Sequence, residues 1–181
     1  MEIHKIPDLR SPVMVVAFSG WNDAGEAATG AASHLLASWT DSSTDVVPEL
    51  IADVDPEDFY DFQVNRPMVE VDDSSIRSLT WPGTQVFGLR TPSLKHDFVV
   101  VRGVEPSMKW KTFAADILDL ADDLEVDMVI TLGSMLADTP HTRPITVSGS
   151  GAHPDIARRL GVEISKYEGP TGILGVLQDA C

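Results

Sequence analysis

The chain has 181 residues, of which 43% are hydrophobic and 23% charged, a composition typical of a folded globular protein and unlike that of a disordered one. Its 28 acidic and 13 basic residues give a formal net charge of −15, which repels phosphate backbones and anionic lipids, so we expect neither nucleic acid nor membrane as a partner. The single cysteine, Cys181, excludes an internal disulfide and a cysteine-based zinc site.

The first predicted strand is the branched apolar run Val13–Phe18, which is too short for a signal peptide or a membrane span. Because a lone cysteine also indicates a reducing compartment, we expect a cytoplasmic protein. The polar turn Ser19–Asp23 ends this strand, and the alanine-rich segment Ala24–Trp39 predicts a helix.

The middle of the chain predicts several short strands. One is expected over Asp45–Val54, and the acidic and aromatic segment Asp55–Gln63 is either a short helix or an exposed recognition loop. Short apolar runs then predict strands around a turn at Pro82-Gly83, within residues 66–71, 78–81 and 84–89. We expect this region to form a hairpin or an excursion of strands.

The second half alternates strands with helices. The strand Phe98–Arg102 precedes a helix whose apolar side chains recur at helical spacing from Trp110 to Leu124, with Ser107 as its expected N-cap. Further elements are expected as strands at Asp127–Leu132, Ile145–Ser148 and Val162–Ile164, and as helices at Pro154–Leu160, ended by Gly161, and after Gly172. This order predicts one α/β domain over residues 1–181, with three layers around a mostly parallel mixed sheet.

Three turns of this fold are candidate binding segments, because α/β proteins bind ligands where strands end and helices begin. Each turn also has a simpler structural interpretation: Asp23 and Thr171 are able to cap helices, and Trp21 to pack on the rim of the sheet. The candidate binding residues are Gly20, Trp21, Asn22 and Asp23 in the first turn, Gly133, Ser134, His141 and Arg143 in the second, and Gly169, Thr171 and Gly172 in the third.

The chain contains no complete catalytic or metal-binding motif. The turn after the first strand lacks the glycine spacing of a dinucleotide site and the Gly-Lys-Ser/Thr of a P-loop. Ser134, Asp138 and His141 are the residue types of a catalytic triad, but no GxSxG surrounds the serine. The histidines show no metal-ligand spacing; they are His4, His34, His96, His141 and His153. We therefore expect no catalytic residue, no metal and no cofactor.

Three segments, Val15–Ala28, Thr131–Pro144 and Tyr167–Leu177, resemble the proteasome assembly chaperone 2 family and occur in the family's order. Its actinobacterial branch is the most similar, through TrpAsnAsp after the first strand and ProHisThrArgPro in the later loop. The resemblance implies an α/β fold similar to the phosphorylase/hydrolase-like nucleoside phosphorylases. It also implies a C-terminal continuation in relatives that this chain is expected to lack.

Two functions follow as hypotheses. The resemblance implies a protein-interaction domain, chaperone-like for proteasome assembly, with proteasome subunits as partners and self-association into a homo-oligomer. The alternative is a small-molecule enzyme of nucleosidase, phosphorylase or hydrolase type that uses a pocket at the rim. This alternative rests on the implied fold similarity and on the cluster Ser134, His141 and Arg143.

Overall fold

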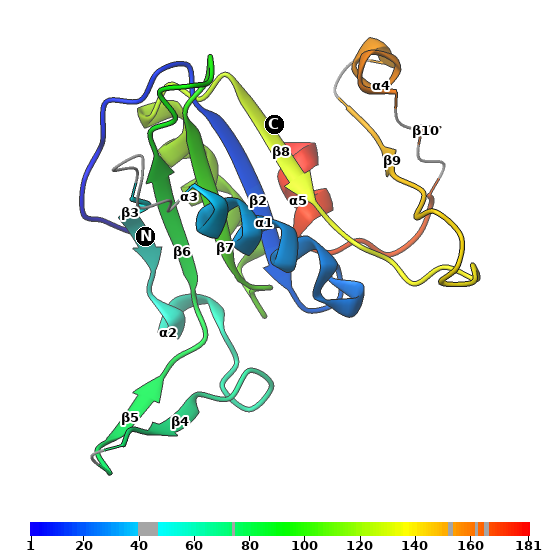
Figure 1. Cartoon of the computed structure of the whole chain (residues 1–181). Helices are drawn as coiled ribbons and strands as arrows, with labels where there is room; N and C mark the ends of the chain where they lie inside the picture. The colour runs from blue at the N-terminus through cyan, green and yellow to red at the C-terminus, as the bar shows by residue number, and fades with distance from the viewer. Residues whose placement is uncertain (40–46, 74, 152–153, 162, 165–166) are drawn as a thin grey trace. The chain divides into compact units, whose positions relative to one another are not determined.

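The computed structural model describes residues 1–39, 47–73, 75–151, 154–161, 163–164 and 167–181 (Figure 1). Contacts between residues divide the chain into two compact units. The first comprises Met1–Met135 together with Thr171–Cys181, and the second comprises Leu136–Pro170. The single domain expected over residues 1–181 stays a prediction.

A six-stranded sheet forms the centre of the first unit, in the order β1-β3-β6-β7-β2-β8. β2 (Val13–Ser19) lies between β7 (Phe98–Val104) and β8 (Met128–Leu132), and both pairings are parallel. The remaining pairings are antiparallel and join β7 to the strands β6 (Thr84–Leu89), β3 (Glu49–Val54) and β1 (Glu2–Ile3).

The α/β class is thus confirmed, and the sheet is mixed. The expectation that it is mostly parallel is wrong for the half that contains β1, β3 and β6. Parallel neighbours need a long crossover, usually a helix, to bring the chain back to the start of the next strand. Two long helices, α1 (Ala27–Ser38) and α3 (Trp110–Asp123), lie in the sequence before β3 and after β7. Between β3 and β7 the only described helix has four residues.

The two faces of the sheet are covered by different helices (Figure 1). On one face, Phe18 of β2 packs into the core formed with α3 (Trp110–Asp123) and α5 (Ile173–Ala180). On the other face, Ala17 packs against small side chains of α1 (Ala27–Ser38). The alternation of neighbouring β2 residues between the faces is the two-residue period of a strand, and it gives the first unit a helix–sheet–helix layering.

The helices form where the sequence predicts them, but some begin differently. The segment predicted as one helix consists of a short 3₁₀ helix at Ala24–Glu26 followed by α1. The expected cap Ser107 is wrong, because α3 begins after Lys109, which has a left-handed φ of 56°. The Ser107 hydroxyl instead accepts hydrogen bonds from Asp61 N and Asn65 Nδ2, both at 3.1 Å, which ties it to the preceding loop.

The region between β3 and β6 forms an excursion of strands, as predicted. It contains α2 (Pro56–Phe59) and a separate antiparallel hairpin of β4 (Met68–Val71) and β5 (Arg77–Thr80). The helix is one of the two alternatives expected for residues 55–63. Pro82-Gly83 does not join paired strands, because β5 and β6 belong to different sheets. The residues 45–46 of the predicted preceding strand lie outside the described ones.

The second unit contains short elements. β9 (Ser148–Gly149) pairs in parallel with β10 (Glu163–Ile164), so the predicted strand over residues 145–148 is confirmed only at its end. α4 (Pro154–Leu160) has its predicted bounds, and Gly161, with a left-handed φ of 66°, follows it. Val162 and His153 lie outside the described residues.

Candidate functional site

The ends of β2 and β8 bring two of the predicted turns together in the first unit. Ser134 N donates to Asn22 O at 2.8 Å, and Ala24 N donates to Ser134 O at 3.2 Å. A parallel bridge between Asp23 and Ser134 continues the pairing of the two strands beyond their ends. The first turn and the residues Gly133 and Ser134 of the second therefore lie side by side.

Asp23 caps a helix as expected, but the helix is α1, whose N-cap position is Glu26, and not one that begins at Ala24. The side chain is buried, with 7% exposed, and its Oδ1 accepts hydrogen bonds from Ala28 N at 2.8 Å and Thr29 N at 3.2 Å. The Thr29 hydroxyl donates to the other carboxylate oxygen. Ser134 Oγ lies 3.4 Å from Asp23 Oδ1 and 3.0 Å from Ala24 O, to which it donates. A carboxylate at this end of α1 satisfies free amides and complements the helix dipole.

Glu105, which the sequence analysis did not single out, holds the third turn. It follows β7 directly, and its Oε1 accepts hydrogen bonds from Asn22 Nδ2 at 2.7 Å and from Ile173 N, the first amide of α5, at 2.9 Å. The cap expected from Thr171 is wrong, because its hydroxyl donates to Gly172 O, at 3.5 Å, while the first amide of α5 donates to Glu105. Glu105 lies three residues beyond the predicted strand Phe98–Arg102, and its partner at residue 173 is far away in the sequence, so the sequence carried no clear signal for this contact.

Gly172 is required by close approach of its neighbours. A Cβ at this position would lie 2.1 Å from Asn22 Nδ2 and 2.4 Å from Glu105 Oε1, far inside van der Waals contact. The glycine therefore lets three segments of the first unit meet: the turn after β2, the end of β7 and the start of α5. Its role here is structural, and the candidate binding residues beside it, Asn22, Asp23 and Ser134, bond to other groups of the first unit.

The other candidate residues are not part of this network. Trp21 was expected to pack at the rim, but its side chain is 62% exposed, which corrects that interpretation. Its neighbours Asn22 and Asp23 face inward to their hydrogen-bond partners and leave the indole at the surface. His141, Arg143 and Gly169 belong to the second unit. That any of these residues binds a ligand stays a prediction.

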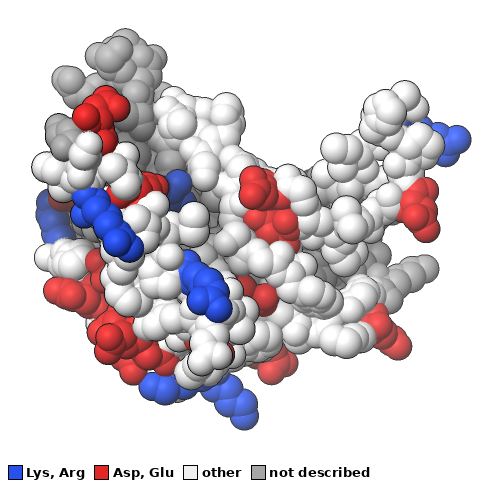
Figure 2. All heavy atoms as spheres, turned by 90° about the horizontal axis from the view of Figure 1, so that it is seen from below, with Lys and Arg blue, Asp and Glu red and all other residues white. Residues whose placement is uncertain are grey.

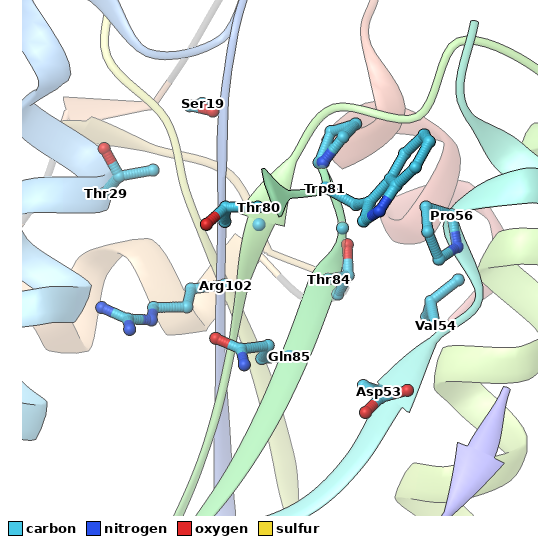
Figure 3. Close-up of a pocket in the computed structure, with 13 residues that line it drawn as sticks. Ser19, Thr29, Asp53, Val54, Pro56, Thr80, Trp81, Thr84, Gln85 and Arg102 are labelled. Carbon is cyan, nitrogen blue, oxygen red and sulfur yellow. The ribbon is translucent and has the colours of Figure 1, made fainter. Parts of the chain in front are cut away.

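A pocket of about 590 Å³ opens on the first unit where β2, β3 and β7 end (Figure 3). Ser19, Thr29 and Arg102 line one side, and Trp81 lines the other. Tyr60 supports the strand behind it: its hydroxyl donates to Val104 O at 2.9 Å and bonds to Thr84 Oγ1 at 2.8 Å. Burial raises the pKa of Tyr60 to about 12, against the opposing effect of the Thr84 hydrogen bond, so the phenol is neutral.

The hairpin β4–β5 presents an exposed apolar face. Val69 pairs with Leu79, and Val71 pairs with Arg77, so these side chains project from one face of the hairpin. Val69, Val71 and Leu79 are 43%, 64% and 46% exposed. We call these three residues the hairpin face. The residues at alternate positions, which include Glu70 and Ser78, point to the opposite face.

Comparison with known proteins identifies relatives over nearly the whole chain. The model of the PAC2 family matches residues 17–181. A crystal structure of a PAC2 family protein from Streptomyces avermitilis is 51% identical with a TM-score of 0.83, and the match covers 94% of this chain and 69% of that one. A proteasome-assembly chaperone homologue from Mycobacterium tuberculosis is 47% identical with a TM-score of 0.82, and the match covers 93% of this chain and 69% of that one.

A more distant structure shares the fold. An archaeal homologue of proteasome-assembly chaperone from Pyrococcus furiosus is 20% identical with a TM-score of 0.53, and the match covers 96% of this chain and 67% of that one. No curated protein matches the sequence. Because the family model covers most of the chain and two solved structures share about half of its residues, the chain belongs to the PAC2 family.

Proposed function

We propose that the chain is a protein-binding domain with a chaperone-like role in proteasome assembly, and that proteasome α-subunits are its partners. The hairpin face carries this proposal. Its three apolar side chains are exposed on a two-stranded hairpin, an arrangement that has little stability of its own and gains from being covered. A contiguous exposed apolar patch often marks a site at which a soluble protein binds another protein.

The relatives support the choice of partner. The Mycobacterium tuberculosis structure, 47% identical to this chain, is described as a proteasome-assembly chaperone homologue. We extend that role to this chain as part of the proposal. We also propose that the fold is of the phosphorylase/hydrolase-like type, as the resemblance implies. This part of the proposal concerns the fold and not an activity.

The charge of the chain favours a partner with basic groups around an apolar centre. The net charge is −15. On the face in Figure 2, acidic side chains stand among uncharged ones, with Lys and Arg interspersed. Such a surface attracts a basic patch at long range, while apolar contact supplies most of the binding free energy.

Ring assembly tests the proposal. The chain is mixed with unassembled α-subunits from its source organism, and rings are followed by native gel electrophoresis. We expect faster ring formation with the wild type and none of this acceleration with Val71→Asp, which places a charge on the hairpin face. Met68→Asp places the same charge on the opposite face, where its cross-strand partner Thr80 is uncharged, and serves as the matched control. Equal rates with and without the wild-type chain would refute the chaperone role.

The small-molecule enzyme is the weaker candidate. The Ser134 hydroxyl donates to Ala24 O, and the Asp23 carboxylate accepts the amides of α1, so both groups have structural partners. Among the residues that the structure describes, no three His, Cys, Asp or Glu side chains gather as a metal site. No arrangement of the described residues favours catalysis over binding.

Self-association and location complete the proposal. We propose that the chain forms a homo-oligomer. Light scattering should then give a mass that is a multiple of 19.6 kDa, and a monomeric mass would contradict this part of the proposal. We also propose that the protein acts in the cytoplasm, where proteasome subunits assemble. None of the described helices is long and apolar enough to span a bilayer.

A further inference from the structure

The pocket at the ends of β2, β3 and β7 has the size of a site for a small organic molecule. Its volume of about 590 Å³ lies within the usual range for ligand pockets and far exceeds the space that a single inorganic ion needs. Figure 3 shows Arg102 and Thr29 on the side of α1, Gln85 and Asp53 below them, and Trp81 on the opposite side. All of these residues belong to the first unit.

A row of polar side chains crosses the sheet at this pocket. Asp53 of β3 pairs with Gln85 of β6, and Gln85 pairs with Arg102 of β7, so the three project from the same face. Asp53 has a partner, His4, whose Nε2 lies 3.0 Å from Oδ2. The side chain of Gln85 has no hydrogen-bond partner within the described parts of the chain, so its side-chain amide is available to a ligand.

Arg102 supplies a positive charge at the pocket. Its guanidinium lies 5.3 Å from the centre of the Phe87 ring, and Nη1 donates to Ser33 Oγ at 3.3 Å. None of the described Asp and Glu side chains forms an ion pair with it, although the chain has 28 acidic residues. A guanidinium keeps its charge at all ordinary pH values and has five N–H donors, so most of them remain for a bound anion.

The opposite wall is apolar. The Trp81 side chain is 49% exposed, and its ring packs edge to face on Phe62 with the ring centres 4.8 Å apart, which fixes its orientation. Val54, Pro56 and Pro82 continue this wall. An aromatic surface held in this way binds the flat or apolar body of a ligand, while the polar row binds its charged end.

We propose that this pocket binds a small organic anion, with its carboxylate or phosphate group at Arg102 and Gln85 and its apolar body against Trp81. The Asp53 carboxylate, which also lines the pocket, is held toward His4 by the contact of its Oδ2 with His4 Nε2 at 3.0 Å. The proposal does not depend on chaperone activity. It adds a small-molecule site to the first unit.

A binding assay with simple probes tests the site. The probes are phenyl phosphate, benzoate, the neutral benzamide and inorganic phosphate, titrated into the full chain by calorimetry and by NMR of the Trp81 indole. We expect phenyl phosphate or benzoate to bind more tightly than benzamide, and the better of the two distinguishes a phosphate from a carboxylate ligand. Arg102→Gln should weaken that binding about tenfold, the usual effect of losing a charged hydrogen-bond pair.

Further variants control for folding. Arg102→Lys keeps the positive charge and should retain part of the affinity, and Trp81→Ala should weaken the aromatic probes but not inorganic phosphate. Arg90→Gln removes an exposed arginine outside the pocket and should have no effect. The proposal is overturned if neither aromatic anion binds at about 10 mM. It is equally overturned if Arg102→Gln, shown to be folded by circular dichroism, binds the probes as the wild type does.

Discussion

Glu105 Oε1 accepts hydrogen bonds from Asn22 Nδ2 and Ile173 N, and Gly172 leaves the space in which these groups meet. The contact is so close that one added carbon atom must displace either the amide or the carboxylate. Both groups would then lose hydrogen bonds as well as van der Waals contact.

Gly172→Ala should lower the free energy of unfolding by about 1–3 kcal/mol, because its Cβ would lie 2.1 Å from Asn22 Nδ2. Gly30→Ala is the matched control: no atom lies within 4 Å of its added Cβ, and α1 gains a better helix former. That variant should gain about 0.5–1 kcal/mol. Urea unfolding measures both, and equal stability of the two variants would contradict the close approach at Gly172.

Asp97, which directly precedes β7 at the end of the strand opposite to the rim, makes the stability of the fold depend on pH. Burial by itself raises the pKa of this carboxyl, but hydrogen bonds from Thr91 N and Arg10 N, together with the Arg10 charge, outweigh it and lower the pKa. A carboxyl with a lowered folded-state pKa stabilises the fold above its unfolded pKa of about 4, and that stability is lost as the pH falls through the folded pKa.

The difference in unfolding free energy between the wild type and Asp97→Asn should therefore be largest above about pH 5 and shrink below about pH 4. Denaturant unfolding over this pH range measures it. A difference that stays constant down to pH 2 would show that the charge of Asp97 contributes nothing and that only its shape is needed.

Among the helices and strands, α5 depends on a cap from outside its own sequence. Its first amide, Ile173 N, donates to Glu105 Oε1 at 2.9 Å. Glu105→Ala should lower the free energy of unfolding by about 1–3 kcal/mol, since two donors lose their acceptor. Glu105→Gln keeps an acceptor oxygen and should lose less. Chemical denaturation separates the two variants, and an alanine variant as stable as the glutamine variant would rule out this cap.

The sequence predicted most elements from their apolar patterns, a branched apolar run for a buried strand and helical periodicity for a helix. The predicted strand Val13–Phe18 and the helical pattern from Trp110 to Leu124 are examples, and most of their apolar side chains are buried. The same periodicity does not define the direction of a neighbouring strand, so the antiparallel pairing of β6 with β7 was missed. Periodicity also does not reveal partners far apart in the sequence.

The rim shows how this limit affects site prediction. Asp23 was predicted as a cap because its amide partners are close to it in the sequence. Glu105 was missed because Ile173 follows it by 68 residues, and Thr171 was chosen in its place from proximity alone. Arg102 was predicted only as the end of a strand. The pocket that it lines also needs residues of β3, β5 and β6, which come from distant parts of the sequence.

For the whole chain, the net charge of −15 should govern how fast and how tightly a basic partner binds. The affinity for α-subunits should fall when sodium chloride is raised from about 0.05 M to about 0.5 M, because salt screens charges that lie more than a few ångströms apart. Binding measured by biolayer interferometry checks this. An affinity that rises with salt would point to apolar contact without electrostatic attraction.

The central claim is that the hairpin face binds proteasome α-subunits, and calorimetric titration of purified α-subunits into the chain tests it most directly. We expect the wild type to bind and Val71→Asp to weaken binding at least tenfold, as loss of a central apolar contact does. Met68→Asp, on the opposite face and paired with the uncharged Thr80, should bind within about twofold of the wild type. Equal affinities of the two variants, or no binding by the wild-type chain, would contradict the claim.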